Sequence, residues 1–486
     1  MTSAPEMTGQ VIGENVDWNQ AQRLVHRLLP LAAASALALI TASANSADAP
    51  EAADPEIARL VHEVSPTRLE TYVRTLAGFG TRHSLSATDD PKRGIGAARR
   101  WIRGTLDGCA AESGARLRVE FDEFVQEATP RIPKAASLTN VIATLEGADP
   151  QARARTLIVS GHYDSMCGNV MNSECDAPGA NDDGSGTAVV IELACTFAKT
   201  RFPATLVFMT VAGEEQGLLG AAHWARVARE KGINIEAMIT NDIVGNAHDE
   251  NGRRDASALR LFAEGVPAGK EVTEEWQSRL SSSGENDSPA RELARTIRDA
   301  AQRYVPEMTV KVVYRRDRYL RGGDHIPFLA QGYTAVRFTE AHEDFRHQHQ
   351  DVRTVDGIQF GDLPQFVDFE YLAGVARVNA AALASLARAP SPPAGVRIET
   401  LQLENKTTLS WRANPESDLA GYEIVWRETT APFWQGAQFV GNVTRASVPL
   451  SKDDYLFSVR AVGKGGQRSL ATYPLTLRNP LLPPVK

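Results

Sequence analysis

Basic residues are outnumbered in this sequence, and no part of the chain gathers Lys and Arg into a cluster. The 486 residues include 52 Lys and Arg against 60 Asp and Glu, which gives a formal net charge of -8. Because recognition of phosphates depends on clustered positive charge, this balance argues against nucleic acid as a partner. The acidic excess suits cations or metals instead.

Long apolar runs are also scarce. The clearest, residues 28–40, is shorter than the roughly 20 residues that a transmembrane helix needs, and no later segment is long and apolar enough. Arg23, His26 and Arg27 precede this run and the small residues 42–44 follow it, which is the pattern of a secretory signal peptide. We therefore expect an exported protein, periplasmic or extracellular, without a transmembrane segment in the mature chain; the alternative is an uncleaved anchor.

Cysteine is rare, with 4 residues in the chain. Export to an oxidising compartment would permit disulfides. Cys167 and Cys175 flank a short polar loop and are the expected pair. Cys195 lies in an apolar helical stretch, where we expect a reduced, buried thiol.

The hydrophobic pattern predicts an α/β fold with a largely parallel sheet, because apolar runs typical of buried strands alternate with helical periodicity. The stretch at 246–308, with a charged, serine-rich portion around 281–288, is expected to be a polar, helical insertion or lid. The expected helices are 57–76, 94–106, 185–199, 218–231 and 371–388, and the expected strands are 117–124, 138–145, 156–160, 204–211, 235–239, 310–314 and 334–338.

The pattern changes after a proline-rich linker at 389–394. Alternating strands, among them 407–411, 422–427 and 455–462, predict a separate all-β domain at 395–486. Trp411 in an early strand and Tyr455 at the start of a late strand resemble a fibronectin type III module. Such a β-sandwich would contact a surface or a protein, or would be a passive, stabilising appendage.

Polar residues fall where the predicted strands end. Ligands of open parallel sheets bind beyond the carboxyl ends of the strands. Each polar residue alone has a structural explanation, as a helix cap or as a hydrogen-bonded core histidine. Together they form an oxygen and nitrogen set that suits zinc and contains no thiolate. The set is His162, Asp182, Glu215, Asp242 and His347.

From about residue 76 to residue 388 the sequence resembles the co-catalytic dizinc exopeptidases of the bacterial leucyl aminopeptidase type, which are related to the glutamate carboxypeptidase and transferrin receptor ectodomains. The motifs that carry the resemblance are GFGTRH at 78–83, GHYDS at 161–165, GANDDGSG at 179–186 and GEEQGLLG at 213–220. The resemblance implies a three-layer α/β/α zinc-peptidase domain, with a mixed, mostly parallel sheet, at 45–388 behind a signal peptide at 1–44. It also implies two Zn²⁺ ions and a peptide substrate.

The resemblance further implies a role for each residue. His162 and Asp242 would bind one zinc, Glu215 and His347 the other, and Asp182 would bridge the two. Glu214 would be the general base that takes a proton from the bridging water.

Two positions in this site keep alternatives. The segment 345–351 contains both His347 and His349; His347 is preferred because it precedes Asp351 by four residues, as in the family pattern. Asp164 follows His162 by two residues, on the same side of the strand, and would orient that imidazole. Its alternative is an exposed loop carboxylate.

The expected activity is that of a zinc-dependent aminopeptidase. The same fold also admits a carboxypeptidase or dipeptidase, a glutaminyl cyclase-like acyltransferase with one zinc, or a receptor-like ectodomain without chemistry. A segment at 321–325 resembles a further family motif near the substrate pocket.

Overall fold

The computed structural model describes residues 53–114, 116–267 and 273–476. The expected signal peptide at 1–44 lies outside these residues. None of the described helices is long and apolar enough to cross a membrane.

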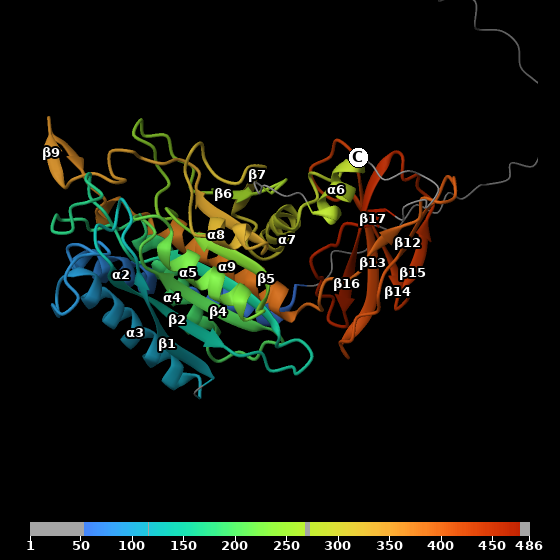
Figure 1. The fold of residues 1–486 in the computed structure, drawn as a ribbon, viewed down its shortest axis with the longest axis horizontal. Coiled ribbons are helices and arrows are strands. Elements are labelled where there is room, and N and C mark those ends of the chain that lie inside the picture. Colours follow the sequence, from blue (N-terminus) through green and yellow to red (C-terminus); the bar gives the residue numbers. More distant parts are fainter. Residues whose placement is uncertain (1–52, 115, 268–272, 477–486) are drawn as a thin grey trace, which may run out of the picture. The chain divides into compact units, whose positions relative to one another are not determined.

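An eight-stranded mixed sheet forms the centre of the larger part of the molecule (Figure 1), in the order β1-β2-β4-β3-β5-β8-β6-β7. The four strands β4, β3, β5 and β8 are neighbours and run parallel. The strands are β1 (Leu117–Gln126), β2 (Ala136–Leu145), β3 (Arg155–His162), β4 (Thr205–Val211), β5 (Asn234–Asn241), β6 (Ala258–Ala263), β7 (Thr309–Val313) and β8 (Ala335–Glu340).

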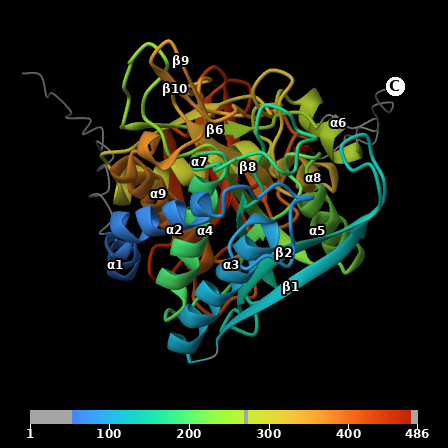
Figure 2. The same ribbon diagram turned by 90° about the vertical axis from the view of Figure 1, so that its left-hand side faces the viewer.

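Helices cover both faces of this sheet (Figure 2), which confirms the predicted α/β architecture. The alternation of side chains along each strand feeds two cores: in β3, Leu157 and Val159 face one core and Ile158 faces the other. One helix layer contains α1 (Pro55–Glu63), α2 (Pro66–Gly78), α3 (Gly94–Glu112), α4 (Gly184–Phe197), α7 (Pro289–Tyr304) and α9 (Phe369–Arg388), and the other contains α5 (Leu219–Glu230) and α8 (His325–Ala330).

The segment 246–308 differs from the polar, helical insertion that its composition predicts. It contains β6, a strand inside the central sheet, as well as α6 (Glu274–Ser281) and α7. Leu293 and Ile297 of α7 are fully buried in the larger core. Polar residues dominate the composition of this segment. The few apolar residues that bury its strand and helix in the core therefore give only a weak pattern in the sequence.

Two smaller β-sheets follow α9 and share a core built around Trp411, Tyr422 and Phe457. This β-sandwich agrees with the predicted all-β character of the C-terminal part. One sheet has the order β15-β12-β11-β17 and the other β14-β13-β16. The strands are β11 (Arg397–Ile398), β12 (Thr407–Ser410), β13 (Leu419–Glu428), β14 (Gly436–Gly441), β15 (Arg445–Val448), β16 (Tyr455–Gly463) and β17 (Leu475–Thr476).

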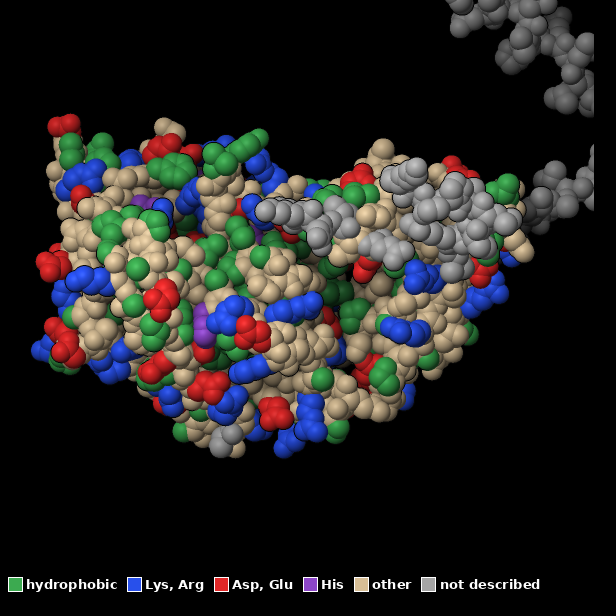
Figure 3. Space-filling view, in the orientation of Figure 1, with side chains coloured by type: hydrophobic (Ala, Val, Ile, Leu, Met, Phe, Trp, Pro, Cys, Tyr) green, Lys and Arg blue, Asp and Glu red, His purple; other side chains and the backbone are tan. Residues whose placement is uncertain are grey.

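A buried ion-pair cluster joins the C-terminal sheets to the α/β part. Asp287, fully buried beside the start of α7, pairs with Arg427 of β13 at 2.8 Å and with Arg295 of α7 at 2.8 Å. The indole N–H of Trp434 donates to Glu292 of α7 at 3.1 Å. On the face that Figure 3 shows, acidic and basic side chains are interspersed.

All four cysteines form disulfides. The expected pair Cys167–Cys175 is present. The expectation of a reduced Cys195 is wrong: α3 packs against α4, which brings the Cα atoms of Cys109 and Cys195 to 5.0 Å, a separation that a disulfide spans.

Candidate metal centre

The predicted site residues meet because four parallel strands end at one edge of the sheet. His162 is the last residue of β3, and Asp242 directly follows β5. Glu214 and Glu215 come shortly after β4. This is the edge at which ligands of open α/β sheets bind.

Asp182 lies between the two histidine groups of the site. Its Oδ1 is 3.2 Å from Nε2 of His162, and its Oδ2 is 2.9 Å from Nε2 of His349. The loop that carries Asp182 is set by its neighbour Asp183, which accepts hydrogen bonds from the backbone amides of His162 and Gly186. The peptide bond between Asp182 and Asp183 is cis.

Close packing of β3 on α4 brings this loop to the strand end. Gly161 is needed for that approach, because a Cβ on it would lie 2.5 Å from the backbone of Gly186. Gly186 is needed as well, because its own Cβ would lie 2.2 Å from the backbone carbonyl of Asn241 in β5. These glycines belong to two of the motifs in which the family resemblance was found.

Two sets of three ligand-type side chains result. Within each set, the possible donor atoms lie within 4.8 Å of one another. One set is His162, Glu214 and Asp242, and the other is Asp182, Glu215 and His349.

His349, and not the preferred His347, occupies the histidine position of the second set. Its Nε2 is 3.2 Å from Oε2 of Glu215. His347 instead stacks on Phe366 with ring centroids 3.7 Å apart, and its Nδ1 lies 3.7 Å from Asp344. The assignment of His347 is therefore corrected to His349: a turn in this segment, with a positive φ of 53° at His349, directs the later histidine to the cluster.

The donor chemistry of these sets fits zinc. Four carboxylates, from Asp182, Glu214, Glu215 and Asp242, crowd around two imidazoles in a buried site. Nε2 of His162 and Oε1 of Glu215 are buried without a hydrogen-bond partner among the described residues. Buried polar atoms and charges need partners, and cations bound by these oxygen and nitrogen atoms would supply them.

The titration behaviour of the cluster reflects this crowding. Burial raises the pKa of Glu214 well above its usual range, and the carboxylates of Asp242 and Glu215 add to the effect. Burial opposes protonation of His349, but the carboxylates of Glu215 and Asp182 raise its pKa to about 11. The cluster therefore attracts positive charge strongly.

Asp164 is fully buried, so the alternative of an exposed loop carboxylate does not apply. Its Oδ1 lies 3.6 Å from Nδ1 of His162. Its two carboxylate oxygens accept the backbone amides of Glu214 and Glu215, each at 3.2 Å. Asp164 thus lies beside the imidazole and also ties down the turn that presents both glutamates.

Several supporting residues were not anticipated. Asp362 accepts the backbone amides of Asn181 and Asp182, the latter at 2.7 Å, and so holds the central aspartate in place. Arg337, a charged residue in the middle of a fully buried strand, pairs with Asp242 at 2.9 Å. An arginine inside a predicted buried strand is the sequence feature from which Arg337 could have been identified.

Arg82 explains why the motif at 78–83 belongs to the site. This guanidinium is fully buried and donates to the backbone carbonyls of Tyr163, Pro178 and Gly179. It therefore joins the segment after β3 to the loop that leads to Asp182.

A cavity of about 300 Å³ opens onto the cluster, and Asp182, Glu214, Asp242 and His349 are among the residues that line it. Of the predicted motif at 321–325, Arg321 and Gly322 line this cavity. A larger cavity of about 540 Å³, which His347 lines, does not include the two ligand sets.

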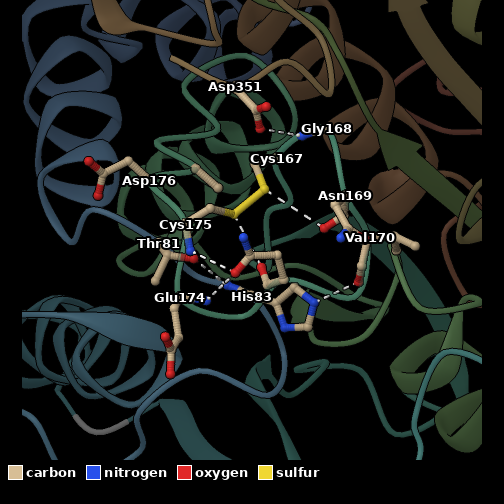
Figure 4. Close-up of a disulfide and its surroundings, with 12 residues drawn as sticks. Thr81, His83, Cys167, Gly168, Asn169, Val170, Glu174, Cys175, Asp176 and Asp351 are labelled. Carbon is tan, nitrogen blue, oxygen red and sulfur yellow. Dashed lines mark hydrogen bonds between the residues drawn. A yellow bond between two sulfur atoms is a disulfide. The ribbon is translucent and has the colours of Figure 1, made fainter. Parts of the chain in front are cut away.

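The Cys167–Cys175 loop lies near two members of the second ligand set, His349 and Glu215 (Figure 4). The backbone amide of Gly168 donates to Asp351 at 3.1 Å, and the carbonyl of Val170 contacts Nε2 of His83 at 2.8 Å. His83 in turn contacts Gln216, the residue after Glu215. The disulfide loop thus contacts Asp351, two residues after His349, directly, and it contacts Gln216, the neighbour of Glu215, through His83.

Comparisons with known proteins show the family to which the chain is similar. The model of peptidase family M28 matches residues 140–363. A probable zinc metalloprotease of Pyricularia oryzae is 48% identical over 427 residues, which cover 87% of this chain and 84% of that protein. A second, of Leptosphaeria maculans, is 45% identical over 423 residues, which cover 87% and 97%.

Among solved structures, an aminopeptidase from Aneurinibacillus sp. strain AM-1 has a TM-score of 0.47 at 16% identity, covering 68% of this chain and 96% of that chain. The two sequence relatives extend over most of the described α/β part and beyond the family match. On this similarity and coverage, the chain belongs to peptidase family M28.

Proposed function

We propose that this protein is a zinc-dependent aminopeptidase that removes N-terminal residues from peptides and uses two Zn²⁺ ions. The observation that carries the proposal is the position of Asp182, whose two carboxylate oxygens face His162 on one side and His349 on the other. Two cations held about 3.5–4 Å apart need a shared anion between them, and Asp182 is in the position to supply it.

In this proposal His162 and Asp242 would hold one ion, Glu215 and His349 would hold the other, and Asp182 would be shared between them. When bound, the ions supply Lewis acidity and lower the pKa of a coordinated water. The relatives named probable zinc metalloproteases support zinc as the metal.

Glu214 is the proposed general base. It lines the cavity beside the ligand sets, and its Oε2 is 4.0 Å from Nε2 of His162. Its carboxylate would take a proton from the attacking water and deliver it to the amine that leaves. Asp164 would hold Glu214 and Glu215 in different orientations through their backbone amides.

A substrate panel tests the activity. The protein, loaded with zinc, is assayed on amino-acid anilides, dipeptides, N-acetylated dipeptides and a peptide with N-terminal glutamine, with and without a chelator. We expect release of the N-terminal residue from free amines, loss of activity on acetylation and chelation, and recovery with zinc. Cleavage of the acetylated peptides would indicate a carboxypeptidase, and cyclisation without cleavage would indicate an acyltransferase.

We also propose that the protein is exported. The two disulfides support this, because structural disulfides persist in oxidising compartments. Fractionation of producing cells and N-terminal sequencing test it: the expected product starts after residue 44, outside the cytosol. A cytosolic chain with four reactive thiols would contradict the proposal.

For the C-terminal sheets we propose contact with a protein substrate. Leu401, Leu403 and Phe439 are large apolar side chains with exposures of 56%, 99% and 53%. Changing all three to Ser is expected to slow hydrolysis of a long polypeptide and to spare that of a dipeptide. Equal effects on both substrates would contradict it.

A further inference from the structure

Three arginines line the cavity that opens onto the ligand sets. We call Arg131, Arg318 and Arg321 the arginine rim. Arg318 and Arg321 come from the loop between β7 and α8. Arg131 reaches the cavity from the loop between β1 and β2, and its guanidinium donates to the backbone carbonyl of Glu215 at 2.7 Å. Two loops that are distant in the sequence thus bring positive charge to the same opening.

The carboxylates that pair directly with the rim balance only part of its positive charge. Glu343 pairs with Arg318 and with Arg321, each at 2.8 Å, and also with Arg260 at 2.7 Å. One carboxylate therefore faces three guanidinium groups. Asp317, 3.1 Å from Arg318, is shared with Arg337 at 3.3 Å. Arg131 has a backbone carbonyl and no carboxylate within salt-bridge distance among the described residues.

The rim also contains N–H donors that make no hydrogen bond to the described residues. A guanidinium has five N–H donors in a planar fork that matches a carboxylate. Arg321 directs one nitrogen, Nη1, to Glu343, and its side chain is 31% exposed. The Nε and Nη2 atoms of Arg321 donate no hydrogen bond to any of the described residues. A second carboxylate that enters the cavity can therefore be bound by Arg321.

We propose that the arginine rim binds a carboxylate of the substrate next to the scissile bond. This inference rests on the proposed peptidase function. The substrates it names are short peptides in which the free C-terminal carboxylate, or an acidic side chain adjacent to the cleaved bond, reaches the rim. The scissile bond lies at the ligand sets, and the rim orients the peptide by charge-assisted, two-pronged hydrogen bonds.

Paired substrates test this inference. Leu-Leu is compared with Leu-Leu-amide, which lacks the carboxylate, and Leu-Asp-amide is compared with Leu-Asn-amide to separate a side-chain acid from a terminal one. A hydrogen bond to a charged group contributes about 1.5–3 kcal/mol, so we expect kcat/KM to favour the acid of at least one pair by about tenfold or more. Arg321→Gln is expected to reduce that ratio to below about threefold, mainly through KM.

Arg315→Gln is the matched control. Arg315 belongs to the same loop, lies over the ring of Tyr319 and does not line the cavity. We expect this variant to keep the wild-type ratio. Wild-type ratios near one in both pairs, or ratios that Arg321→Gln leaves unchanged, would overturn the proposal.

Binding separates this inference from the proposed activity. Calorimetry on zinc-loaded Glu214→Gln protein, with and without Arg321→Gln, measures the affinity for the same four peptides without turnover. If the acidic peptides bind more tightly than the amides, and Arg321→Gln abolishes this difference, the carboxylate site at the rim is supported, even if no hydrolysis is detected in the wild type. Hydrolysis of all four peptides at equal rates would keep the peptidase and reject the rim.

Discussion

Asp351 accepts a hydrogen bond from the backbone amide of Gly168 at 3.1 Å and so ties the segment that carries His349 to the loop closed by Cys167–Cys175 (Figure 4). A Cβ on Gly168 would lie 3.3 Å from the Asp351 carboxylate. The two segments are 183 residues apart in the sequence, and the disulfide limits how far the loop can move away from the site.

Removal of the Cys167–Cys175 disulfide is expected to impair the site more than the fold. The bridge spans 8 residues, so the chain-entropy relation predicts a loss of about 2–3 kcal/mol in the free energy of unfolding. The double variant Cys167→Ser, Cys175→Ser should bind zinc more weakly and lose several-fold in kcat, measured by metal titration and peptide hydrolysis.

The second disulfide provides the control. Cys109–Cys195 spans 86 residues between α3 and α4, so Cys109→Ala, Cys195→Ala should cost about 4–5 kcal/mol by urea unfolding. The activity per folded molecule should stay close to that of the wild type. If both double variants show the same activity and zinc affinity, the loop does not position the site.

The two histidines of the segment 345–351 should differ sharply when changed to alanine. His349→Ala removes a proposed metal ligand. Loss of a residue that only hydrogen-bonds to a ligand typically lowers metal affinity or activity by about 10–100-fold, so loss of the ligand itself should lower activity by more than about 100-fold. Zinc content should fall toward one ion per chain. His347→Ala, which loses a ring stacked on Phe366, should retain two ions; the reverse result would restore His347 as the ligand.

Glu214→Gln tests the proton-transfer role. The amide cannot accept a proton from water, so kcat should fall by about 10²–10⁴-fold, the usual contribution of general acid–base catalysis. Zinc content by elemental analysis should stay at the wild-type value, because Glu214 is not among the proposed ligands. Near wild-type turnover would rule out the role, and loss of metal would show that Glu214 is a ligand.

The buried pair of Asp287 and Arg427 should contribute strongly to stability. Asp287→Ala leaves Arg427 buried without its carboxylate and Arg295 with Glu292 alone, and it should cost about 3 kcal/mol or more of unfolding free energy. Glu230→Ala, which breaks an exposed ion pair with Arg226, should cost less than about 0.5 kcal/mol. Similar urea midpoints for the two variants would mean that the interface with β13 contributes little.

Much of the fold could be predicted because its elements carry their periodicity locally. The apolar run of β3 and the alanine-rich helix α9 were expected within a few residues of their observed bounds. The strand β6 was missed because its six residues form a short apolar segment within a polar stretch. These residues become a strand by pairing with β7 and β8.

The candidate site was also largely predictable from its motifs. His162, Asp182, Glu215 and Asp242 follow strands or precede a helix in a pattern that places them at one sheet edge, and they meet there. The choice between His347 and His349 depended on the path of a loop. Sequence spacing does not determine such a path, because turns redirect side chains by a single residue.

The α/β core, the all-β C-terminal part and the main set of ligand-type residues could be predicted from the amino-acid sequence alone, because periodicity and motif spacing are local properties. The folded chain was needed to establish which histidine reaches Asp182, that Cys195 pairs with Cys109, and that the arginine rim gathers at the cavity. These features depend on contacts between segments far apart in the chain, and such contacts are set by packing of the whole core.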